Sequence, residues 1–95
     1  MKITPQLKEY QRENERICRI FSARLKTLKE ERGLSSYDIA DILGISRQSV
    51  VYYTIGSRIP NIPVLVSLSV LFNVSVDYLL GVTDSRLRYP PSQMH

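Results

Sequence analysis

The N-terminal third of the chain carries an uninterrupted helical pattern. Residues 6–32 contain no glycine or proline, and leucine, lysine, glutamate, glutamine and arginine dominate them. In the second half of this stretch the apolar residues recur at three- and four-residue steps and form one stripe: Ile17, Ile20, Phe21, Leu25 and Leu28. Gly33 is expected to end the helix as a left-handed C-cap. The pattern leaves open whether the helix is continuous or breaks within residues 14–19.

Two short helices, separated by three residues, are predicted in the middle of the chain. Ser35 and Asp38 form a Ser-x-x-Asp capping pattern that opens the first helix, and Gly44 ends it. Ser46 caps the second helix, which runs over about residues 47–55 and stops at Gly56. Two helices joined in this way are a helix-turn-helix candidate.

The remainder of the chain predicts further short elements. Residues 64–72 fit a helix by their apolar spacing, yet their valine-rich, partly alternating pattern also fits a strand. Ser75 caps a last helix over 76–80, and Gly81 follows its end. Residues 83–95, with two arginines and two consecutive prolines, predict a loose tail.

Composition excludes several classes of function. Ninety-five residues make one domain, and a single cysteine, Cys18, excludes an internal disulfide. The only histidine is His95, so a Cys–His dyad, a histidine-rich metal site and a Ser-His-Asp triad all lack a placed histidine. We therefore expect that the protein is not an enzyme and that it binds neither a cofactor nor a metal. No apolar export signal or spanning segment is present, which favours a cytoplasmic protein.

The charge of the chain is unevenly distributed. The net charge is +4, and residues 1–32 hold nine Lys/Arg against five Asp/Glu, whereas residues 33–95 hold four of each kind. The basic excess therefore lies in the N-terminal third and favours a polyanionic partner.

The helix over 47–55 presents a polar first turn. With Val50 set toward the core, Gln48, Tyr52 and Ile55 point away from it, at about 100° per residue. Arg47 and Gln48 occupy the first turn, where a recognition helix presents side chains to base edges. Gln can pair with adenine and Arg with guanine, each pair contributing about 1–3 kcal/mol of discrimination. A helical bundle in which these residues are merely solvated fits the spacing equally well.

Four stretches follow one another in residues 24–81 with nearly gapless spacing: 24–35 (RLKTLKEERGLS), 39–47 (IADILGISR), 56–60 (GSRIP) and 64–81 (VLVSLSVLFNVSVDYLLG). In this order they resemble the five-helix DNA-binding domain of the phage repressor/Cro (XRE-type) regulators. The resemblance implies an all-α fold and makes 64–72 the fourth helix. The expected organisation is an N-terminal helical extension (1–23), a helix-turn-helix domain (24–82) and a flexible tail (83–95).

The resemblance also implies a set of DNA-binding residues. In this family the third helix enters the major groove, and a dimer reads two half-sites. Base-facing or groove-lining roles follow for Arg47, Gln48, Ser49 and Tyr52. Phosphate-binding roles follow for Ser35 and Ser36 at the start of the second helix, and for Ser57 and Arg58 after the third.

The chain departs from the family pattern at several of these positions. Ser36 stands where a longer Gln is common, and Lys29 and Thr54 replace a usual ion pair. Apolar or aromatic residues occupy positions that are usually polar: Val51, Tyr52, Ile55 and Val70. Because the charges of segment 35–58 sum to zero, we expect modest affinity per monomer and reliance on dimerisation.

The N-terminal extension allows two interpretations. A heptad-like seam with a polar core position runs through Leu7, Tyr10, Asn14, Ile17, Phe21, Arg24 and Leu28. The seam is short, so an amphipathic helix folded onto its own domain is favoured over a helix-mediated dimer. Four cations of the extension recur at three- and four-residue intervals and predict one basic ridge along the helix: Lys8, Arg12, Arg16 and Arg19. This ridge either contacts the DNA backbone or is only solvated. Val66 and Val70 leave the inward stripe of their helix and are candidates for a subunit contact.

The expected function is a sequence-specific, double-stranded DNA-binding transcriptional regulator, a homodimeric repressor that reads the major groove with its third helix. A regulatory protein is a further candidate partner, and no small-molecule effector is expected. The alternative is a protein-interaction module on a helix-turn-helix fold, an anti-repressor or antitoxin-like adaptor whose apolar third-helix face binds a protein.

Overall fold

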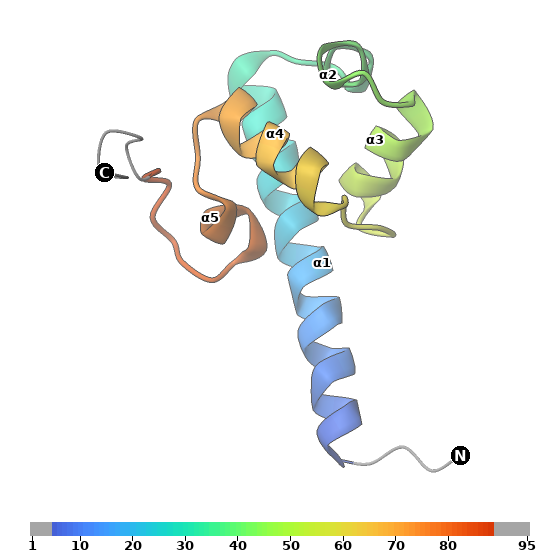
Figure 1. Cartoon of the computed structure of the whole chain (residues 1–95), viewed down its shortest axis with the longest axis vertical. Coiled ribbons are helices and arrows are strands. Elements are labelled where there is room, and N and C mark those ends of the chain that lie inside the picture. Colours follow the sequence, from blue (N-terminus) through green and yellow to red (C-terminus); the bar gives the residue numbers. More distant parts are fainter. Residues whose placement is uncertain (1–4, 89–95) are drawn as a thin grey trace.

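The computed structural model describes residues 5–88, with side chains from residue 7 onward, and throughout this range the regular structure is helical (Figure 1). The helices are α1 (Pro5–Arg32), α2 (Ser36–Leu43), α3 (Arg47–Ile55), α4 (Ile62–Phe72) and α5 (Val76–Leu80). The all-α, five-helix prediction is confirmed, and residues 64–72 are helix rather than strand. None of the described helices is long and apolar enough to cross a membrane.

The caps explain where the short helices begin. The side-chain oxygens of Ser35, Ser46 and Ser75 each accept the backbone N–H three residues later, at 3.1, 3.1 and 2.9 Å. Helix α4 begins two residues earlier than its apolar pattern indicates, because Asn61 caps it by accepting the N–H of Val64 at 3.0 Å. Local polar side chains therefore fix the start of each of these helices.

One core joins all five helices. Its buried apolar members are Phe21, Leu25 and Leu28 of α1, Ile39 and Ala40 of α2, Val50 of α3, Leu65, Leu68 and Phe72 of α4, and Val74, Tyr78 and Leu79 at α5. Helix α1 packs against both α3 and α5, which flank it in Figure 1, while α2 packs mainly against α3 and α4 against α5.

Helix α1 is continuous, without a break in residues 14–19. Its first half extends away from the other four helices (Figure 1), and residues 7–16 are all exposed. The prediction that the extension folds onto its own domain is therefore wrong for this half, because the body covers α1 only from Ile17 onward. The boundary expected between residues 23 and 24 falls inside this helix, between the buried residues Ser22 and Leu25.

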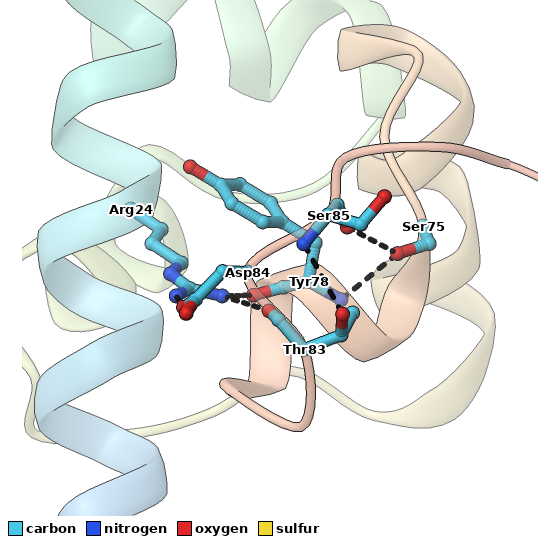
Figure 2. A network of polar contacts seen from close by, with 6 residues as sticks. All are labelled: Arg24, Ser75, Tyr78, Thr83, Asp84 and Ser85. Carbon is cyan, nitrogen blue, oxygen red and sulfur yellow. Dashed lines mark hydrogen bonds and ion pairs between the residues drawn. The ribbon is translucent and has the colours of Figure 1, made fainter.

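The prediction of a loose tail is wrong for residues 83–88. Figure 2 shows Arg24 of α1 facing this segment: its guanidinium donates to the carbonyl of Thr83 at 2.7 Å and to the carboxylate of Asp84 at 2.8 Å. The same guanidinium donates to the carbonyl of Tyr78 and lies over the Tyr78 ring, 4.2 Å from its centroid. The rest of the predicted tail, residues 89–95, lies outside the described residues.

A second ion pair holds the end of this segment against α1. Arg86 donates two hydrogen bonds to the carboxylate of Glu31, at 2.8 and 2.9 Å, and the backbone N–H of Ser75 donates to the Arg86 carbonyl at 3.1 Å. The hydrogen bonds from Arg86 lower the pKa of Glu31. We call residues 83–88 the strap, since two charged side chains of α1 hold it in place.

Gly81, directly after the end of α5, packs against Ile20 of α1. Its φ of +79° lies in the left-handed region, and a Cβ there would stand 2.8 Å from the side chain of Ile20. A side chain at position 81 would therefore strain the backbone and displace Ile20.

Candidate nucleic-acid interface

Helix α3 is held in one rotation about its axis. Val50 is fully buried, and the ring of Tyr53 meets Phe21 of α1 edge-on, with centroids 6.3 Å apart and planes at 78°. The buried hydroxyl of Ser22 donates to the carbonyl of Thr54 at 2.6 Å, which ties the last turn of α3 to α1. These contacts use one side of α3 and leave the opposite side facing solvent.

The solvent-facing side of α3 carries the base-reading candidates. Arg47 and Gln48 are exposed in its first turn. Val51 and Ile55 follow on the same side and are 37% and 63% exposed, whereas Tyr52 is half-buried. The interface therefore combines a polar first turn with an apolar continuation.

Two tyrosines hold the arginines of this surface. The guanidinium of Arg47 lies 4.2 Å from the ring centroid of Tyr37 on α2, and that of Arg58 lies 4.4 Å from the ring of Tyr52. Stacking leaves the N–H groups at the guanidinium edge available to acceptors. Sequence reasoning missed Tyr37, because its pairing with Arg47 arises only from the packing of α2 against α3. Tyr52 supports Arg58 instead of standing free in the groove.

The serines around α3 are engaged in local hydrogen bonds. The hydroxyls of Ser46 and Ser49 lie 2.8 Å apart, and the hydroxyl of Ser57 donates to the carbonyl of Tyr52 at 3.3 Å. Ser49 and Ser57 are thus near the surface that the sequence indicated, but their hydroxyls also stabilise the two ends of α3.

At the start of α2 the structure departs from the phosphate site that the resemblance implies. The backbone N–H of Ser35 donates to the carboxylate of Asp38 at 2.8 Å, so a negative charge already occupies this N-terminus. That N–H, followed by the Ser35 hydroxyl, lowers the pKa of Asp38. An incoming phosphate would meet this carboxylate rather than a vacant helix end.

Lys29 supplies a cation beside the same helix end. Its Nζ donates to the hydroxyl of Ser36 at 2.9 Å, across the turn between α1 and α2. Sequence reasoning treated Lys29 only as half of a missing ion pair. The fold makes it a candidate phosphate ligand, with Ser36 as the side chain that orients it.

Nothing in the described part of the chain offers a metal site, since no three His, Cys, Asp or Glu residues gather there. The chemistry available at this surface is hydrogen bonding, charge and apolar contact. Such a surface is suited to binding another molecule through these three kinds of interaction.

Comparisons with known proteins agree with this geometry. A family model described as helix-turn-helix matches residues 25–79, from the second half of α1 to α5. The chain is 39% identical over 61 residues to the uncharacterized HTH-type transcriptional regulator YqaE of Bacillus subtilis (strain 168), covering 64% of this chain and 53% of that protein. It is 39% identical over 67 residues to the SPbeta prophage-derived uncharacterized HTH-type transcriptional regulator YonR of the same organism, covering 70% of this chain and 62% of that one.

A solved structure has the same arrangement. The crystal structure of a transcriptional regulator from Listeria innocua superposes with a TM-score of 0.63 at 32% identity, covering 78% of this chain and 68% of that one. The chain spans little more than half the length of the Bacillus relatives that it matches. Residues 5–24, which include the projecting half of α1, lie outside the match to the family model.

Proposed function

Because the chain belongs to the helix-turn-helix family, we propose that it is a sequence-specific transcriptional regulator that binds double-stranded DNA and reads the major groove with α3. The observation that carries this proposal is the fixed rotation of α3. Val50 and Thr54 are buried against the body, while Arg47 and Gln48 are exposed on the first turn. Arg47 then reads guanine and Gln48 reads adenine, the two bidentate pairings that these side chains favour.

The residues around α3 orient the protein on the DNA backbone. Arg58, stacked on Tyr52, binds a phosphate on one side of the helix, and Lys29, bonded to Ser36, binds one beside α2. Ser35, Ser49 and Ser57 support these contacts through the caps and turns that they stabilise. Phosphate contacts fix the register, and base contacts give the specificity.

The functional unit in this proposal is a homodimer on a palindromic operator. One exposed row of branched apolar side chains runs along α4 at four-residue spacing: Ile62, Val66 and Val70, which are 75%, 46% and 55% exposed. No charged residue lies between Arg58 and Asp77, so burying this row between two copies desolvates no charge of α4 itself. We assign the subunit contact to this α4 face.

Repression and a cytoplasmic location belong to the same proposal. A small domain that occupies an operator blocks other proteins from that DNA without needing a second surface. Neither a catalytic step nor a small-molecule effector is part of the proposal, and a regulatory protein remains a candidate partner. The proposed regulator is cytoplasmic because the DNA that it binds lies in the cytoplasm.

One observation favours a second candidate function. Val51 and Ile55 expose apolar surface on the same side of α3 as Gln48, which would also suit a protein partner. In that case the domain is an interaction module of the anti-repressor or antitoxin-like kind. Substituting Val51 by Ser would then abolish capture of the partner while leaving the domain folded.

Selection of bound duplexes from a random pool, at two salt concentrations, tests the first function against the second. A DNA regulator enriches a palindromic motif, which delivers both the base preference and the symmetry of the dimer. A pool that stays random at both salt concentrations would reject base reading and leave the interaction module.

A further inference from the structure

The projecting half of α1 has no role in the function proposed above. Residues 7–16 are exposed and extend beyond the rest of the fold (Figure 1), outside the segment that matches the helix-turn-helix family. Short helical segments gain little stability in water without packing partners. A binding partner would therefore stabilise this half of α1.

Three cations line one face of α1 at seven-residue spacing: Arg12, Arg19 and Lys26. Seven residues are close to two helical turns, so each successive side chain is rotated by only about 20° about the helix axis. It also stands about 10 Å further along that axis. All three are exposed, and none forms an ion pair with another described residue. We call them the basic row.

Other cations of α1 are already engaged. Arg16 pairs with Glu13 at 3.1 Å, and Arg24 and Lys29 bond to the strap and to Ser36. Arg32 donates to the carbonyl of Phe72 at 3.1 Å. The basic row therefore holds cations that the fold does not use.

The basic row adjoins the end of the recognition helix. Arg19 and Lys26 line a shallow groove between α1 and the last turn of α3, whose other wall includes Ile55 and Gly56. Arg58, the phosphate ligand proposed above, follows Gly56 by two residues. From this groove the row continues along α1 to Arg12, and so extends the edge of the candidate interface.

The charge distribution points the same way. Segment 35–58, which contains α2, α3 and the loop after them, carries two cations and two anions, whereas residues 1–32 carry the entire excess of +4. Affinity for the DNA backbone depends on the number of phosphates that Lys and Arg neutralise. The recognition segment alone supplies no net charge for this purpose. Within α1, residues 17–32 hold five cations against two anions, whereas residues 7–16 hold three of each kind.

We propose that Arg12, Arg19 and Lys26 bind phosphates of the DNA backbone outside the base pairs that α3 reads. The inference rests on the proposed function. It gives α1, from Lys26 beside the body to Arg12 on its projecting half, the task of lengthening the DNA footprint. Glu30 lines the groove that contains Lys26, and Glu15 lines a neighbouring groove that contains Arg19. Both carboxylates weaken the attraction of the basic row for phosphate. The row is therefore worth about two neutralised phosphates rather than three.

The test uses the full chain, the selected duplex with flanks of about ten base pairs on each side, and the same duplex trimmed to its core. The variant is Arg12→Gln/Arg19→Gln/Lys26→Gln, whose glutamines keep a comparable helix propensity, with circular dichroism as a check on folding. We expect the wild-type protein to prefer the long duplex and the triple variant to lose this preference. Between 50 and 200 mM salt the wild type should lose about tenfold more affinity than the variant.

A matched pair of single variants separates position from net charge. Arg12→Gln removes a cation of the row, whereas Arg88→Gln removes an exposed cation beside Asn73, on the strap. Only Arg12→Gln should reduce the preference for the long duplex. If the triple variant keeps both the preference and the salt dependence of the wild type, the inference is overturned, although α3 still binds DNA. If the wild type itself binds no duplex, the proposed function fails together with it.

Discussion

In the proposed function, individual side chains at the surface of α3 have different tasks. Gln48 projects from the first turn with no hydrogen bond to another described side chain, whereas Arg47 and Arg58 are each held on a tyrosine ring. Holding a guanidinium in place reduces the conformational entropy that binding must otherwise remove. At this scale the structure distinguishes one exposed amide, Gln48, from two guanidinium groups that tyrosine rings orient.

Replacing Gln48 by Ala should lower affinity for the selected duplex by about 1–3 kcal/mol and relax the preference at one base position, because a bidentate pair is lost. The measurement is a titration of the selected duplex and of a set of single-base variants. Arg58→Gln is the matched control, since removing a phosphate contact weakens binding to all sequences and reduces the salt slope by about one unit. Uniform loss on every sequence for Gln48→Ala would disprove base reading by this residue.

Val51 offers a second test at the scale of one methyl group. If its exposed side chain packs on a thymine, replacing that thymine by uracil removes the 5-methyl group and should cost about 0.8 kcal/mol, roughly fourfold in affinity. In Val51→Ala the same replacement should matter little, whereas Ile42→Ala, which alters an exposed apolar residue of α2, should respond like the wild type. Identical binding of the thymine and uracil duplexes by the wild type would count against this contact and favour a protein partner for the apolar face.

At the scale of the helices, sequence patterns predict what local interactions determine. Ser35, Ser46 and Ser75 cap helices that begin where expected, and inward rotation of Val50 predicts which side of α3 is exposed. These features depend on neighbours within four residues. The sequence pattern therefore predicts the bounds of α3 and its exposed residues directly.

Features that depend on distant contacts are not predictable in this way. The hold of Arg24 on the strap joins residues 60 positions apart, and Lys29 reaches Ser36 only because α1 and α2 fold against each other. The sequence predicts Asp38 as part of the cap that opens α2. Its effect on a phosphate site depends on the hydrogen bond between its carboxylate and the Ser35 N–H, which only the structure shows. For this reason the sequence pattern indicated neither the contacts that hold residues 83–88 nor the carboxylate that lies beside the expected phosphate site at α2.

Arg24→Met should destabilise the fold by about 2 kcal/mol, because it leaves the carbonyls of Tyr78 and Thr83 without this donor while keeping an apolar stem of similar length. Thermal or urea unfolding of the full chain measures the change. Arg12→Met, on the exposed half of α1, is the control and should change stability by less than about 0.5 kcal/mol. Equal stability of the two variants would mean that the strap contributes nothing to holding α1 against α5.

For the whole molecule, the arrangement of charge and apolar surface is the main feature. The whole basic excess lies in residues 1–32, the candidate base-reading side chains lie on α3, and the uncharged exposed row lies on α4. The proposed homodimer through α4 would present two α3 helices to one duplex, which would compensate for the small number of cations in each recognition segment.

Val66→Glu should disrupt this dimer, because it places two like charges in an apolar contact from which water is excluded. Analytical ultracentrifugation should show a shift to monomer, and affinity for the palindromic duplex should fall while affinity for a single half-site remains. Val82→Glu, which introduces the same single charge at an exposed valine outside α4, is the matched control for added charge. Should Val66→Glu remain dimeric and bind the palindrome normally, the subunit contact lies elsewhere, and the seam of α1 becomes the next face to test.

The central claim is that α3 reads the base sequence of a duplex, and a direct titration tests it. The full chain is titrated at low salt with the duplex obtained by selection and with a shuffled duplex of the same length and composition. The account predicts binding of the selected duplex about a thousandfold more tightly than the shuffled one. Equal affinity for the two, or no complex with either, would contradict it.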